Sequence, residues 1–67
     1  MDEKDYVVEG MKAWGGSFIR RLADLILTAD PINLNKIKMT WPEYWETYRK
    51  RGEDYLNAEK PEPQKGE

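Results

Sequence analysis

The sequence predicts an all-α fold, a small bundle of three to four short helices with a disordered C-terminal tail. Apolar residues recur three and four positions apart in successive segments, which is the spacing of a helix face. Helix-start residues and prolines stand before these segments, and the connections between them are very short. A chain of 67 residues has room for one core. We therefore expect a single helical domain over residues 1–57.

The predicted tail covers residues 58–67. This stretch holds prolines, a glycine and five charged residues, and it has no large apolar side chain. Such a composition buries too little surface to offset the entropy lost on ordering, which is why we expect disorder.

The segment before Gly15 fits either a helix or a short strand. Its apolar residues at positions 6, 7, 10 and 14 follow a helical stripe, and acidic residues at positions 2, 3 and 5 suit a helix start. The run Tyr6-Val7-Val8 also suits a strand. We expect the helix.

A second helix is expected over residues 17–29, with Ser17 as its N-cap after the Gly15-Gly16 break. Its main apolar face consists of Phe18, Leu22, Leu25, Ile26 and Ala29. Three further apolar residues widen this face to nearly half the circumference, more than one small core needs. We expect these three to form an interface between copies of the chain: Ile19, Ala23 and Leu27.

A third, short helix over residues 31–39 is predicted by Asp30-Pro31, a cap followed by a proline at the first helical position. Leu34, Ile37 and Trp41 share one face of it. Apolar residues at positions 32 and 39 point the other way, so we expect this helix to be sandwiched or to bridge its neighbours.

The longest helix is expected over residues 42–57, with Thr40 and Glu43 as a capping box and Pro42 in the first turn. Its apolar stripe consists of Tyr44, Trp45, Tyr48, Gly52, Tyr55 and Leu56. Gly52 either lets another backbone come close or ends the helix early.

The composition excludes several classes of site. The chain has no cysteine and no histidine, so disulfides, sulfur-ligated zinc sites and ordinary catalytic triads are absent. Its acidic residues form no recognised metal loop. We expect neither catalysis nor a cofactor or metal. The polar N-terminus and short apolar runs predict neither a secretory signal nor a membrane span, which favours the cytoplasm.

Between positions 34 and 51, four aromatic residues lie between two groups of basic residues. The aromatic residues share one face with Leu56, which is typical of a core stripe, so Trp41 and Trp45 are either in the core or at the surface. Trp, Tyr and Arg are also the usual anchors of protein interfaces, and a partner-binding surface is expected at Trp41, Trp45, Tyr48, Arg49 and Arg51. The alternative reading of this segment is a weak nucleic-acid site at Lys36, Lys38, Arg49 and Arg51. The net charge of -2 opposes that alternative.

Gly15-Gly16-Ser17 followed by Arg20 and Arg21 suggests a second alternative. Glycines at a helix start expose backbone N–H groups, and arginines one turn later can grip a phosphate. A signalling nucleotide would be the ligand. The simpler interpretation is a turn and a cap.

The middle of the chain, residues 15–48, contains a combination of short motifs: Gly15-Gly16-Ser17-Phe18-Ile19, Leu22-Ala23, Ala29-Asp30-Pro31, Asn33, Lys36-Ile37, Trp41-Pro42-Glu43-Tyr44-Trp45-Glu46 and Tyr48. With these motifs the chain resembles small helical proteins encoded by tailed bacteriophages and prophages. The resemblance implies a phage accessory protein acting in the host bacterial cytoplasm. Together with the small core, it leads us to expect a non-enzymatic homo-oligomer that binds and inhibits a host protein, such as part of a defence system.

Overall fold

The computed structural model describes residues 2–58 and contains four helices in that range: α1 (Glu3–Trp14), α2 (Ser17–Thr28), α3 (Pro31–Thr40) and α4 (Pro42–Asn57). The all-α prediction is therefore confirmed. The first segment is a helix and not a strand, and its start is fixed by the Asp5 carboxylate, which accepts a hydrogen bond of 3.3 Å from the Asp2 backbone. The predicted tail lies outside the described residues, apart from Ala58 at the end of α4.

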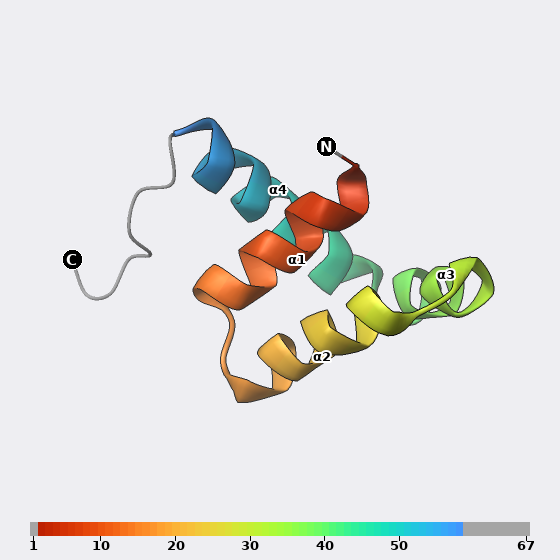
Figure 1. Cartoon of the computed structure of the whole chain (residues 1–67). Coiled ribbons are helices and arrows are strands. Elements are labelled where there is room, and N and C mark those ends of the chain that lie inside the picture. Colours follow the sequence, from red (N-terminus) through yellow and green to blue (C-terminus); the bar gives the residue numbers. More distant parts are fainter. Residues whose placement is uncertain (1, 59–67) are drawn as a thin grey trace.

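The closest helix pair is α1 and α4, which run in the same direction and cross (Figure 1). Gly10 and Gly52 lie at the crossing. A Cβ atom added at Gly52 would meet the carbonyl group of Tyr6, and one added at Gly10 would meet the carbonyl oxygen of Tyr48. Of the two roles foreseen for Gly52, the structure shows the close backbone approach, because α4 continues to Asn57.

The other two helices form the crossover between α1 and α4. α2 packs along α1, and an ion pair of 2.6 Å joins Lys12 Nζ to Asp24 Oδ1 across them. α3 lies at the far end of the bundle and touches α4 more lightly (Figure 1). A 3.1 Å ion pair from Lys38 Nζ to Glu3 Oε1 ties it back to the start of α1.

The core lies between α1, α2 and the inner sides of α3 and α4. It consists of Val7, Val8, Met11, Ile19, Leu22, Ala23, Ile26, Ile37 and Trp45. Among the described residues, no buried residue is polar or charged, and the indole N–H of Trp45 is the polar group that the core side chains contain. The fold is thus held mainly by apolar packing, and ion pairs link the helices at the surface.

Two predicted caps are wrong. Ser17 is the first helical residue, and Gly16 occupies the N-cap of α2 without a side-chain bond. Thr40 belongs to α3, where its hydroxyl donates a 2.7 Å bond to the Lys36 carbonyl, so it is not available to cap α4. The predicted cap at Asp30 is confirmed, because its carboxylate accepts a 2.8 Å bond from the Asn33 backbone.

The predicted face of α2 is rotated from the observed one. The helix buries Ile19, Leu22, Ala23 and Ile26. Phe18 and Leu25, which were assigned to the core face, are exposed. The physical reason is that the apolar arc is wider than α1 can cover, so Phe18 and Leu25 on one flank and Leu27 on the other remain in water.

Candidate partner-binding surface

An exposed group of aromatic side chains, the aromatic corner, consists of Phe18, Trp41 and Tyr44. The Phe18 ring lies 6.4 Å from the Trp41 ring, edge to face, and also 6.4 Å from the Tyr44 ring. Phe18 is 59% exposed and Tyr44 is 37% exposed, while Trp41 is half-buried. Three rings from two parts of the chain, the start of α2 and the junction of α3 with α4, thus gather on one surface.

Local structure places these rings. Trp41 is the single residue between α3 and α4, and its backbone amide donates a 3.0 Å bond to the Ile37 carbonyl. The connection is therefore a tight corner, and the Trp41 and Tyr44 rings both lie beside the Phe18 ring. Phe18 is the second residue of α2 and lies on the flank that α1 leaves uncovered.

Exposed rings in such a group favour contact with another protein. Each aromatic ring removes a large apolar area from water when it is covered, and edge-to-face contacts hold the rings in a defined geometry. Tyr and Trp are also enriched among the residues that dominate binding energy. The arrangement has the composition of an interface anchor.

The predicted partner-binding residues do not form one surface. Trp41 reaches the aromatic corner, whereas Trp45 is only 5% exposed and packs inside the bundle. Tyr48 is partly buried against the same core. Arg49 and Arg51 are occupied by neighbouring side chains, as described next. Placing Trp45 at a partner surface was therefore wrong, because the α4 stripe faces α1.

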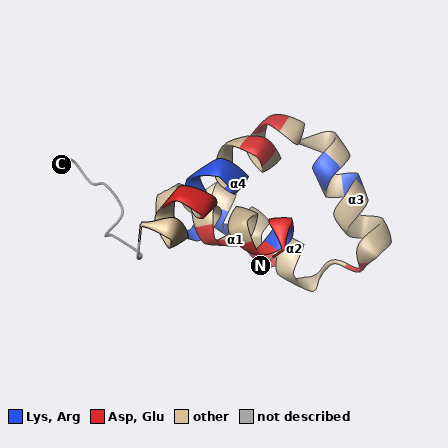
Figure 2. Cartoon of the chain, turned by 90° about the horizontal axis from the view of Figure 1, so that it is seen from above, with Lys and Arg blue, Asp and Glu red and all other residues tan. Residues whose placement is uncertain are grey.

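Two of the three basic residues of α4, Arg49 and Arg51, are engaged by neighbouring side chains within the chain. Arg49 donates to Glu46 at 2.6 Å and to Glu53 at 3.1 Å, and the hydrogen bond from Arg49 lowers the pKa of the exposed Glu46 carboxyl. The Arg51 guanidinium lies 5.7 Å from the centre of the Trp14 ring. Figure 2 shows acidic and basic segments alternating along α4, so no continuous basic stripe follows this helix.

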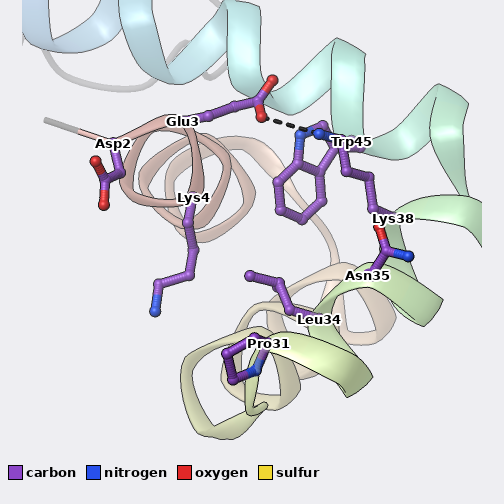
Figure 3. Close-up of a pocket in the computed structure, with 8 residues that line it drawn as sticks. All are labelled: Asp2, Glu3, Lys4, Pro31, Leu34, Asn35, Lys38 and Trp45. Atoms are coloured by element: carbon purple, nitrogen blue, oxygen red, sulfur yellow. Dashed lines mark hydrogen bonds and ion pairs between the residues drawn. The ribbon is translucent and has the colours of Figure 1, made fainter.

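Trp45 also lines an open hollow of about 400 Å³ between α1, α3 and α4 (Figure 3). Lys38 Nζ lies 5.4 Å from the centre of its ring and reaches the Glu3 carboxylate. In the described part of the chain, the buried indole nitrogen Nε1 of Trp45 has no hydrogen-bond partner. The contacts of Lys38 with Trp45 and Glu3 connect α1, α3 and α4, and we interpret them as stabilising the fold.

The predicted nucleotide site lies at the exposed start of α2. A shallow hollow there is lined by Lys12, Ser17, Arg20, Arg21 and Asp24. The Lys12 ammonium, hydrogen-bonded to Asp24, lowers the pKa of that carboxyl, which is therefore ionised near neutral pH. The ion pair with Asp24 occupies the Lys12 ammonium, so a phosphate would depend on Arg20 and Arg21. Gly15 and Gly16 form the turn before the helix.

The predicted oligomer interface does not form a surface either. Ile19 and Ala23 are buried in the core of the single chain, so copies cannot meet through them. Leu27 alone of the three is exposed.

Sequence reasoning missed Phe18 and Tyr44, which it assigned to core stripes. The informative signal was present, since an apolar arc approaching half of a helix in a very small domain must leave one flank uncovered. The sequence alone does not show which part of the arc is exposed, because that depends on the position of α1 relative to α2.

No protein-family model matches the chain, and comparisons with curated proteins and with solved structures find no match. In the part of the chain that the structure describes, no helix has the length and apolar character needed to cross a membrane.

Proposed function

We propose that this chain is a non-enzymatic accessory protein of bacteriophage type, which binds and inhibits a host protein through the aromatic corner and acts as a homo-oligomer in the bacterial cytoplasm. The observation that supports this proposal most is the exposure of Phe18 beside Trp41 and Tyr44. The resemblance of residues 15–48 to phage proteins supplies the biological setting.

The two alternatives have weaker support. A nucleotide sponge at Arg20 and Arg21 would place phosphate beside the Asp24 carboxylate. A nucleic-acid site would need Lys38 and Arg49 to leave the carboxylates that they now contact. The aromatic corner requires no such exchange, because two of its three rings, those of Phe18 and Tyr44, already face water.

The test uses the full chain immobilised as bait in a host lysate, compared with the variants Phe18→Ala and Tyr44→Ala. We expect the native chain to retain one host protein in stoichiometric amount. Each variant should weaken binding by about 2 kcal/mol, roughly thirtyfold, if the rings are interface anchors. Thr47→Ala, on an exposed polar position of α4, is the control and should bind like the native chain.

The captured protein is then purified, titrated with the chain by calorimetry, and assayed for its own activity. Inhibition that disappears with the Phe18→Ala variant supports the proposal. Capture that is equal for the native chain and both corner variants would refute it, as would heat from a cyclic nucleotide that Arg20→Ala abolishes.

A further inference from the structure

The helix α3 is apolar on two opposite sides. Its inner side places Ile37 in the core, with Leu34 packed against it. Its outer side carries Ile32 and Met39, which are seven residues apart and therefore lie about two turns apart on one face. They are the two most exposed large apolar residues described, at 71% and 73%. A helix that is apolar on both sides is normally covered on both.

The surface continues from α3 onto α2. Lys36 lies between Ile32 and Met39 along the helix, and it lines a shallow groove together with Leu25, another exposed apolar residue. We name this surface the α3 outer face; it consists of Leu25, Ile32, Asn35, Lys36 and Met39. The aromatic corner is a separate set of residues.

We infer that a second copy of this chain covers the α3 outer face, which makes the protein a homodimer through α3. This defines the oligomer assumed in the proposed function, but it does not depend on any host partner. It also replaces the interface predicted at Ile19 and Ala23, which the core occupies.

The first argument is the area. Leu25, Ile32 and Met39 together leave on the order of 350 Å² of apolar side-chain surface in water, near the largest patch of an ordinary monomer. A standard interface buries about 800 Å² per partner, of which a little over half is apolar. The α3 outer face therefore supplies most of the apolar area that one side of a small dimer needs.

The second argument is the chemistry of the polar groups in the face. Asn35 is exposed at the edge of the face, where it also lines the hollow of Figure 3. Its amide both donates and accepts, so it can pair with the same residue of another copy. Its Nδ2 donates a 3.4 Å bond to the Met39 sulfur within the chain, a weak interaction that a stronger acceptor can replace. Lys36 is the only charge in the face, and its long stem can extend to the rim.

The oligomeric state is tested by sedimentation equilibrium of the full chain between about 1 and 500 µM. We expect a reversible dimer of twice the 7.9 kDa chain mass, with a dissociation constant in the micromolar range for an interface of this size. Ile32→Glu and Met39→Glu should each raise that constant at least tenfold. Their helix content by circular dichroism should stay unchanged, because both side chains face water in the single chain.

Leu27→Glu is the matched control. It places the same charge at an exposed apolar position on another flank of α2, and it should leave the dimer intact. A second readout uses the absence of cysteine in the chain. Asn35→Cys should form a disulfide-linked dimer under mild oxidation, whereas Leu27→Cys should remain largely uncrosslinked.

A chain that stays monomeric at 500 µM and is not crosslinked through Asn35→Cys would overturn the inference. A dimer that Leu27→Glu disrupts and Ile32→Glu does not would overturn it as well. If the isolated chain is monomeric and Ile32→Glu abolishes capture of a host protein, the face belongs to that protein instead. These results leave the test of the aromatic corner unaffected, since that test uses different variants and a different partner.

Discussion

Replacing Gly52 by alanine tests the closest contact in the bundle. On an exposed helix, Gly→Ala stabilises by about 1 kcal/mol. Here the added Cβ would overlap the Tyr6 carbonyl oxygen, and it would lie 2.7 Å from the Tyr6 carbonyl carbon and 3.0 Å from the Gly10 nitrogen. All three are backbone atoms, so a side-chain rotation cannot relieve the overlap.

The size of the effect follows from that geometry. Relief requires α1 and α4 to separate, which weakens the packing of Val7, Met11 and Trp45 in the core. An overpacking cost at the upper end of the usual range, about 3 kcal/mol or more because the clash is with backbone, less a gain in helix propensity of about 1 kcal/mol, leaves a net loss of about 2 kcal/mol or more. A chain of this length is stable by about 3–10 kcal/mol in total, so the change is large.

The assay is urea and thermal unfolding followed by circular dichroism, with Gly16→Ala as the control. A Cβ added at Gly16 would meet nothing within 4 Å, so the substitution should cost only the preference for glycine over alanine at the N-cap of α2, about 0.5–1 kcal/mol. Gly52→Ala should lower the melting temperature by roughly 10–20 °C. A Gly52→Ala variant as stable as the native chain, or more stable, would refute the close approach of the two helices.

Three further outcomes are expected. Asp30→Ala should cost about 1 kcal/mol in urea unfolding because α3 loses its cap, whereas Thr40→Ala should cost less than about 0.5 kcal/mol; equal losses would contradict the observed caps. Trp45→Ala should destabilise by about 3–5 kcal/mol, and a loss below 1 kcal/mol would place this ring outside the core. The Lys12 ammonium lowers the pKa of Asp24 below its ordinary value of 3.8. The ion pair between Lys12 and Asp24 therefore stabilises the fold fully above pH 3.8, and this stabilisation is lost as the pH falls through the lowered pKa of Asp24. Asp24→Asn should flatten this part of the stability-against-pH curve, and an unchanged curve would argue against the pair.

The sequence was sufficient to predict the helices because their boundaries depend on local chemistry. Asp30-Pro31 begins α3 through a hydrogen bond to a residue three positions away, and Gly15-Gly16 separates α1 from α2. The failure at Thr40 is local too. Its hydroxyl had two possible partners, and it bonds to the preceding turn of α3 instead of capping α4.

The functional surface was harder to predict because it depends on directions between helices. Periodicity shows that Phe18 and Ile19 both lie within the apolar arc of α2, but only the position of α1 decides that Ile19 is buried and Phe18 is not. The same limit applies to α4, where Trp45 is buried and the adjacent Tyr44 is exposed. Spacing defines an arc, and packing selects the part of it that remains exposed.

The one-residue connection at Trp41 has a consequence for the kinetics of recognition. A change in the angle between α3 and α4 would require changes in the two backbone torsions of Trp41, whose amide is already hydrogen-bonded to the Ile37 carbonyl. The indole and the phenol beside it are consequently presented in a ready-made orientation. Binding to a partner should therefore cost little conformational entropy at these two rings, and differences in affinity should appear mainly in the dissociation rate.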